Sequence, residues 1–101
     1  MKIATHWQVP DDHPALAGHF PGLPILPGVI LLDLALQIII DTYALSLANC
    51  TVNAVKFLSP AIPGDLLSIA HDQLKHGVFH FDISTAARKI ASGSVQFNIS
   101  S

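Results

Sequence analysis

Residues 19–48 read HFPGLPILPGVILLDLALQIIIDTYALSLA, and this stretch decides the fold. Its first ten residues hold three prolines and two glycines, so they continue an irregular loop that starts at about Asp11. The residues after Gly28 are dominated by Leu, Ile and Ala. They predict a helix from about Gly28 to Ala48, about 30 Å long at 1.5 Å per residue. A helix that is apolar nearly all round is typical of a buried core helix.

Three polar residues interrupt this helix, namely Asp33, Gln37 and Asp41. They lie four apart and therefore share one stripe of the helix surface. Two carboxylates near the middle of a bilayer would be costly, so we expect no membrane span. Either the stripe reaches solvent at one edge of the core, or Asp33, which is nearest the loop, faces a site.

The rest of the chain has the pattern of strands. One segment alternates Phe79, Phe81 and Ile83 with polar residues, and Val95, Phe97 and Ile99 alternate in the same way near the end. Further strands are expected near Lys2–Gln8, over Thr51–Ser59 and over Leu66–Lys75, with turns at Pro63-Gly64-Asp65, His76-Gly77 and Arg88-Lys89. The chain is predicted to be one α+β domain, residues 1–101, in which a long apolar helix lies on a mostly antiparallel sheet.

The composition excludes some classes of protein and indicates an oligomer. Half of the residues are hydrophobic, 12% are charged, and the formal net charge is −2 with five Lys and Arg in total. No basic patch is available for nucleic acid. So much apolar surface on 101 residues suggests that a second subunit buries part of it.

Cysteine and histidine usage gives no sign of a metal site. The single cysteine, Cys50, cannot form an internal disulfide and is expected to be a buried or half-buried free thiol. The sequence shows no secretory signal, so a cytoplasmic protein is expected. Five histidines lack ligand spacing and are expected on the surface or in strands: His6, His13, His71, His76 and His80.

The proline-rich loop and the start of the helix carry the candidate chemistry. His19 could act as a base near neutral pH. Gly28 stands at a helix N-terminus, where free N–H groups and the helix dipole favour a developing oxyanion. Asp33 lies on a nearly apolar surface, which favours the protonated form that can donate a proton. A base, an oxyanion site and an acid suit proton abstraction next to a carbonyl with loss of a leaving group.

The same stretch closely resembles the signature of the β-hydroxyacyl-acyl carrier protein dehydratases of the FabA/FabZ type. The residues that match it are Gly18, His19, Phe20, Pro21, Gly22, Pro24, Pro27, Gly28, Asp33 and Gln37. Val55-Lys56-Phe57, Pro60, Pro63-Gly64-Asp65-Leu66 and Ala91–Phe97 extend the resemblance to roughly residues 10 to 99.

The resemblance implies a hot-dog fold, in which a curved antiparallel sheet wraps around one long helix, and a homodimer or higher oligomer formed through the sheet. It implies that His19 abstracts the α-proton of a 3-hydroxyacyl thioester and that the Gly28 N–H holds the thioester oxygen. Asp33 of the other subunit would protonate the departing hydroxyl. Phe20, Pro27, Val29 and Gln37 would contact the substrate, which is carried on the phosphopantetheine of an acyl carrier protein. No metal or organic cofactor is implied.

Two departures from the family pattern bear on function. The acid is Asp, as in the FabA-type branch, where the FabZ-type branch has Glu. Leu58 and Ser59 stand where the family often has basic residues that form a rim for the acidic carrier. The remaining basic candidates for carrier docking are Lys56, Arg88 and Lys89. The weak basic rim favours a specialised pathway, such as polyene or polyketide synthesis, over primary fatty-acid synthesis.

Two other functions remain open. A hot-dog thioesterase would hydrolyse the thioester with a carboxylate and a water, and the spacing of His19, Gly28 and Asp33 argues against it. A non-catalytic module that binds acyl chains would not need both His19 and Asp33. No Gly-x-Ser-x-Gly motif supports a serine hydrolase.

Overall fold

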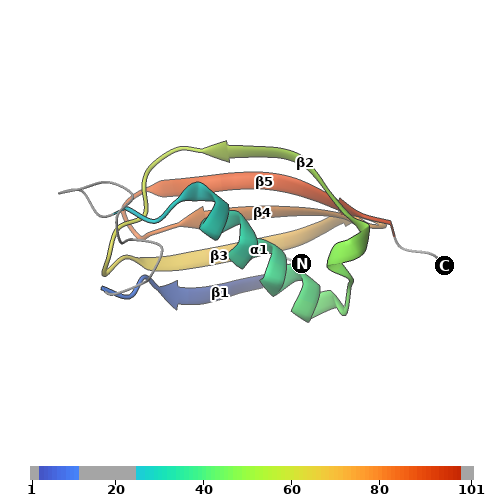
Figure 1. The fold of residues 1–101 in the computed structure, drawn as a ribbon, viewed down its shortest axis with the longest axis horizontal. Coiled ribbons are helices and arrows are strands. Elements are labelled where there is room, and N and C mark those ends of the chain that lie inside the picture. The colour runs from blue at the N-terminus through green and yellow to red at the C-terminus, as the bar shows by residue number, and fades with distance from the viewer. Residues whose placement is uncertain (1–2, 12–24, 99–101) are drawn as a thin grey trace.

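The structure, a computed structural model, describes residues 3–11 and 25–98 (Figure 1). Its longest helix is α1, Gly28–Tyr43, and η2, Leu47–Asn49, is a short 3₁₀ helix. The strands are β1 (Ile3–Gln8), β2 (Cys50–Phe57), β3 (Leu66–Lys75), β4 (Val78–Ser84) and β5 (Lys89–Phe97).

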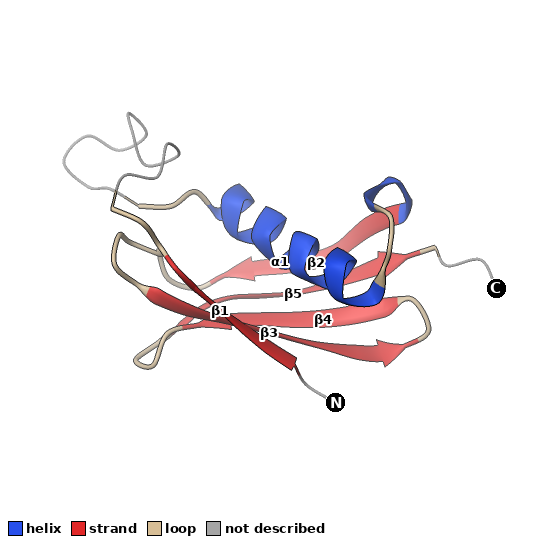
Figure 2. Ribbon diagram, turned by 90° about the horizontal axis from the view of Figure 1, so that it is seen from below, coloured by secondary structure: helices blue, strands red, loops and turns tan. Residues whose placement is uncertain are grey.

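The five strands form one antiparallel sheet in the order β1-β3-β4-β5-β2. Helix α1 runs obliquely across one face of this sheet, as Figures 1 and 2 show from two directions. The predicted α+β architecture, one helix on an antiparallel sheet, is confirmed. Both β1 and β2 lie at an edge of the sheet, so each has one row of backbone groups with no strand beside it among the described residues.

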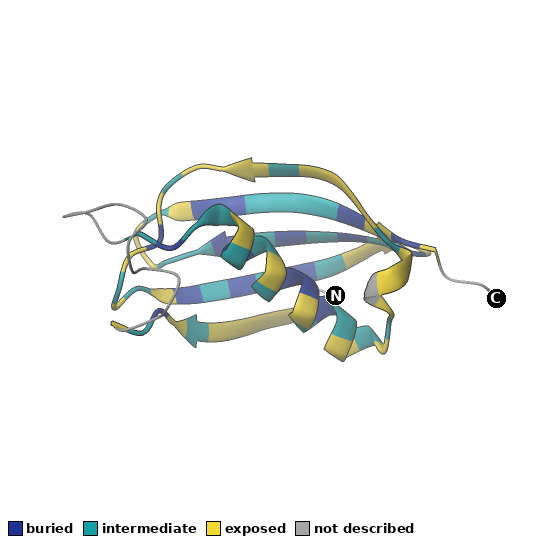
Figure 3. Cartoon of the chain, in the orientation of Figure 1, coloured by how far each residue is buried: buried dark blue, intermediate teal, exposed yellow. Residues whose placement is uncertain are grey.

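The core lies between α1 and the sheet. The predicted alternation in β4 is confirmed, because Phe79, Phe81 and Ile83 are about 1% exposed while the polar residues between them are half-buried. In α1 the buried side chains are Leu31, Ala35, Leu36 and Ile39. Figure 3 shows the resulting pattern, with exposed segments along the outer side of the helix and buried ones along the central strands.

The helix ends five residues earlier than predicted, at Tyr43 and not at Ala48. Ala44 adopts a left-handed conformation with φ 54° and ψ 51°, and its N–H donates to the Ile40 carbonyl. This is the conformation that ends many helices, and glycine is the usual residue there. An alanine gives no such signal in the sequence.

The last strand starts earlier than its alternating pattern predicted. β5 begins at Lys89, where a turn was expected at Arg88-Lys89, and the turn is made by residues 85–88. An irregularity in the pairing at Ile83 and Ser84 leaves both Ile90 and Ala91 buried. Two adjacent buried residues break the alternation from which strands are recognised.

One histidine is more deeply buried than its sequence suggested. His71 lies in β3, as expected for a strand residue, but it is 0% exposed. Its ring packs edge-on against Tyr43 at the end of α1, and its Nδ1 lies 3.4 Å from the Tyr43 hydroxyl. Its Nε2 has no hydrogen-bond partner among the described residues. Cys50 was predicted to be a buried or half-buried free thiol, and the structure has it free and half-buried.

Candidate functional site

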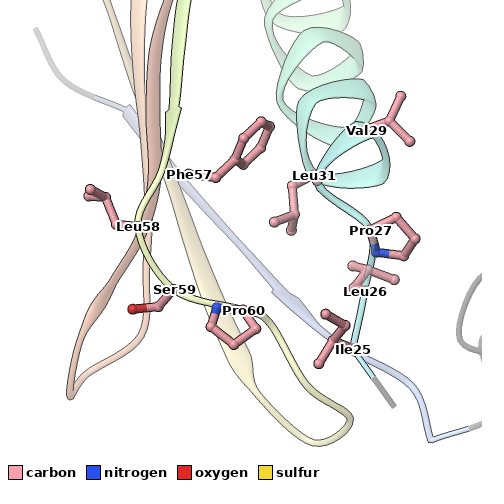
Figure 4. A pocket seen from close by; sticks show the side chains of 10 residues that line it. Ile25, Leu26, Pro27, Val29, Leu31, Phe57, Leu58, Ser59 and Pro60 are labelled. Carbon is pink, nitrogen blue, oxygen red and sulfur yellow. The ribbon is translucent and has the colours of Figure 1, made fainter. Parts of the chain in front are cut away.

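A pocket of about 630 Å³ opens at the N-terminal end of α1 (Figure 4). The segment before the helix and the first turn of the helix form one wall, and the end of β2 with the residues after it forms the other. The lining residues are Ile25, Leu26, Pro27, Gly28, Val29, Leu31, Phe57, Leu58, Ser59 and Pro60. Nearly all of these side chains are apolar, so the pocket suits a hydrocarbon group more than a charged one.

The first turn of α1 lies beside this pocket, and within it the Ile30 N–H donates to the Pro27 carbonyl at 3.0 Å. The N-cap is Pro27, with φ −58° and ψ 145°, and it supplies no side-chain hydrogen bond to the helix. The first N–H groups of any α-helix lack partners within the helix, and the helix dipole makes this end partly positive. A negatively charged oxygen would therefore be stabilised where Gly28 lines the pocket.

Gly28 is the residue that keeps this part of the pocket open. A Cβ built on Gly28 would lie 2.9 Å from two ring atoms of Phe57. Figure 4 shows the Phe57 ring turned from β2 toward the helix. The close approach between the helix N-terminus and the Phe57 ring therefore depends on the absence of a side chain at Gly28.

Much of the apolar surface around the pocket is exposed in the single chain. Val29 is 67% exposed, Phe57 52% and Leu58 49%. These side chains come from the helix and from the end of an edge strand. Exposed apolar side chains around a pocket are typical of a surface that binds a ligand or another protein.

Asp33 does not line the pocket of its own chain, and its side chain is exposed. At 3.6 residues per turn, the stripe Asp33, Gln37 and Asp41 lies on the side of α1 opposite the buried residues. Gln37 Nε2 donates to Asp41 Oδ1 at 2.9 Å. Of the two interpretations of this polar stripe, the one in which it reaches solvent therefore holds for the single chain.

The structure brings together part of the predicted site. Pro27, Gly28 and Val29 all line the pocket, whereas Asp33 and Gln37 lie on the outer face of the helix. His19, Phe20 and the rest of the motif up to Pro24 lie outside the described residues. The wall over residues 57–60 was not predicted to line the site, although Leu58 and Ser59 were noted at the family's basic rim, because an apolar residue at a strand end is ordinarily taken as core.

The basic candidates differ in their surroundings. Lys56 and Lys89 are exposed, whereas Arg88 pairs with Asp65 at 2.6 Å. Within residues 3–11 and 25–98, no three His, Cys, Asp or Glu side chains gather where they could hold a metal ion. No helix in the same part of the chain is long and apolar enough to cross a membrane.

The comparisons with known proteins identify the family. The sequence model of the ApeI-like family, described as ApeI dehydratase, matches residues 1–94. The chain belongs to this family. The FabA/FabZ-type resemblance found in the His19 motif and the strands is thereby confirmed for the chain as a whole.

Curated relatives of this ApeI-like chain are named 3-hydroxyacyl-acyl-carrier-protein dehydratase FabZ. The protein of Chlamydia trachomatis serovar L2 is 28% identical, over 95% of this chain and 71% of its own length. The protein of Campylobacter concisus is 31% identical over 74% of this chain and 60% of its own. The Ehrlichia chaffeensis protein is 39% identical, but the match spans 55% of this chain and less than half, 43%, of that relative.

Solved structures confirm the hot-dog fold. The dehydratase heterocomplex ApeI:P from Xenorhabdus doucetiae matches with a TM-score of 0.80 at 22% identity, over 94% of this chain and 85% of that one. The fluoroacetyl-CoA thioesterase FlK matches with a TM-score of 0.66 at 14% identity, over 94% and 82%. Because dehydratases and thioesterases share this fold, the fold alone does not select the reaction.

Proposed function

We propose that this protein is a 3-hydroxyacyl-acyl carrier protein dehydratase. His19 removes a proton from the α-carbon, and the Gly28 N–H stabilises the negative charge that develops on the thioester oxygen. The bond between the β-carbon and its hydroxyl breaks, and Asp33 donates the proton with which that hydroxyl leaves as water. The product is a trans-2-enoyl thioester. The dehydratase family, the FabZ relatives and the apolar pocket beside a helix N-terminus support this function.

The observation that carries the proposal is the position of Asp33 relative to Gly28. Gly28 lines the pocket, whereas the Asp33 side chain is exposed and does not line it. Both groups can act on one substrate if Asp33 comes from a second copy of the chain. The outer edge of β2 and the exposed Val29, Phe57 and Leu58 provide an apolar surface for such a copy. We therefore propose a homodimer with two shared sites.

The proposed substrate is an acyl chain held as a thioester on the phosphopantetheine arm of a carrier protein in the cytoplasm. The apolar walls of the pocket suit the hydrocarbon, and Pro27 and Val29 are among the residues that line it. In this proposal Phe20 and Gln37 also contact the substrate, and no cofactor takes part. Of the three basic candidates, the exposed Lys56 and Lys89 remain available to an acidic carrier.

The direct test is incubation with 3-hydroxyacyl carrier proteins of several chain lengths. We expect loss of water by mass and the appearance of enoyl absorbance. Release of free thiol without enoyl product would show a thioesterase instead. A protein that binds the acyl carriers but turns over none of them would be a binding module.

Complementation between two inactive variants tests the shared site. We expect His19→Ala and Asp33→Asn homodimers to be nearly inactive. After equal mixing, unfolding and refolding, about half of the dimers should be mixed, and each mixed dimer has one site with both defects and one with neither. Activity should then recover to about one quarter of the wild-type value. If both groups came from the same chain, every site would carry a defect and mixing would restore nothing.

A further inference from the structure

We propose that Arg88 is a positioning residue for the pocket at the start of α1. It holds the loop over residues 60–65, and through that loop it holds the segment that leads into the helix. The inference rests on the proposed function, because it assigns Arg88 a role in the same reaction. It also separates Arg88 from the exposed lysines with which the sequence had grouped it as a candidate for carrier docking.

Arg88 projects from a rigid base. It closes the turn between β4 and β5, two inner strands of the sheet. In this turn the Thr85 N–H donates to the Arg88 carbonyl at 2.8 Å. The Thr85 Oγ1 accepts the N–H groups of Ala87 and Arg88, both at 3.1 Å. The backbone from which the guanidinium extends is therefore fixed to the centre of the sheet.

One guanidinium nitrogen holds both ends of the loop. Arg88 Nη2 donates to Asp65 Oδ2 at 2.6 Å and to the Pro60 carbonyl at 3.0 Å. The same Asp65 oxygen accepts the Ile62 N–H at 3.0 Å. The Asp65 side chain is 14% exposed, so the pair is partly shielded from water. Arg88 and Asp65 therefore tie both ends of this loop to the turn between β4 and β5, while backbone hydrogen bonds with Val9 hold Gly64 and Asp65 from the other side.

This loop is continuous with the pocket. Pro60 lines it, and the next residue, Ala61, pairs with Leu26, whose N–H donates to the Ala61 carbonyl at 2.8 Å. Leu26 directly precedes Pro27, the N-cap of α1. Two hydrogen bonds, from Arg88 to the Pro60 carbonyl and from the Leu26 N–H to the Ala61 carbonyl, therefore connect Arg88 with the backbone that leads into the helix. A displacement of the order of 1 Å in such a group can slow a reaction by about two orders of magnitude.

The surroundings of Arg88 favour positioning over docking. Its charge is balanced by Asp65, so it adds little to the field that an acidic carrier would meet. At 36% exposure its side chain also contributes little to global stability, since partly exposed ion pairs are weak. What the pair provides is the geometry of one loop.

The test compares variants on a 3-hydroxyacyl thioester of N-acetylcysteamine, a small substrate without a carrier. We expect Arg88→Gln to lower kcat by about tenfold or more, with KM changed less than about twofold. Arg88→Lys should recover much of the rate, because both contacts use a single nitrogen. Lys75→Gln, which removes the same charge at the far end of β3, is the matched control and should leave the rate unchanged.

Amide hydrogen exchange supplies a second measurement that needs no substrate. Arg88→Gln and Asp65→Asn should both speed exchange at the Leu26 N–H, while the amides of Phe81 and Val95 stay protected. Unchanged kcat and unchanged exchange at Leu26 would overturn the inference. So would a defect confined to the KM for carrier-bound substrate. An inactive wild-type protein would refute the proposed function, and the exchange rates would then still decide whether Arg88 holds this segment.

Discussion

Gly28→Ala should separate the stability of this protein from its activity. The added Cβ would lie 2.9 Å from two atoms of the Phe57 ring, which is closer than such atoms approach. The ring is 52% exposed and stands at the end of an edge strand, so it can turn outward. Turning it forfeits at most about half of the burial of a Phe side chain, about 1 kcal/mol. Alanine offsets part of this, because it is up to about 1 kcal/mol better than glycine within a helix.

The expected result is a melting temperature within about 8 °C of the wild type and a large loss of turnover. The new methyl group occupies space beside the Gly28 N–H, where the thioester oxygen would bind. We expect kcat to fall by about tenfold or more on a 3-hydroxyacyl thioester. Thermal melts and initial rates of enoyl formation measure the two effects.

Gly93→Ala is the matched comparison, since it adds the same methyl group away from the pocket. Its Cβ would lie 2.6 Å from the Phe81 ring and 2.8 Å from the Ala54 carbonyl oxygen. Phe81 is 1% exposed and the carbonyl belongs to the sheet, so neither can yield easily. We expect a loss of about 1–3 kcal/mol of stability. Normal turnover by folded Gly28→Ala would refute the role given to the space between Gly28 and Phe57.

Three further predictions concern titratable groups. His19→Ala should lower turnover by about two orders of magnitude or more in a protein that remains folded, and near-normal rates would reject His19 as the base. Asp33→Asn should lower turnover to a similar extent without changing the melting temperature, because the side chain is exposed in the chain. The effect of Asp33→Glu on turnover should be milder. Normal turnover by Asp33→Asn would rule out general-acid catalysis by this residue. Burial lowers the pKa of His71, and the neighbouring Asp72 only partly offsets this. The unfolded chain therefore binds a proton more readily than the folded one. The free energy of unfolding should decrease as the pH falls below about 6.5, by at most about 1.4 kcal/mol per pH unit. In thermal melts from pH 8 to 5, the melting temperature of His71→Phe should depend less on pH than that of the wild type.

The fold could be predicted where a sequence pattern corresponds directly to the burial of the residues that form it. The alternation in β4 corresponds to one buried and one half-buried face, and the proline before Gly28 marks the start of α1 correctly. The end of α1 could not be predicted, because Ala44 adopts a left-handed conformation that alanine rarely takes. The start of β5 was missed for a similar reason: an irregular pairing puts Ile90 and Ala91 on the buried side together.

The candidate site was predicted only in part, because the spacing of residues predicts which of them lie close within one helix or strand, and not which segments the fold brings together. Spacing places Gly28 at the helix N-terminus, where the structure has it. It gives no information about the wall over residues 57–60, which meets the helix through the tertiary fold. It also could not separate Arg88 from Lys89, although one is paired with Asp65 and the other is exposed.

The choice between reactions on this fold depends on how the polar groups are divided between the two sides of α1. Among residues 3–11 and 25–98, the pocket is lined by a helix N-terminus and mostly apolar side chains, which suit a thioester and an oxyanion, and no carboxyl group lines it. The carboxyl group nearest the start of the helix, Asp33, is exposed and does not line that pocket. If the protein acted as a single chain, this acid would serve no purpose in the pocket and the exposed Val29 and Phe57 would remain uncovered. A second copy that covers these side chains and supplies its own Asp33 accounts for both features at once, which is why the dimer and the dehydratase activity form one proposal.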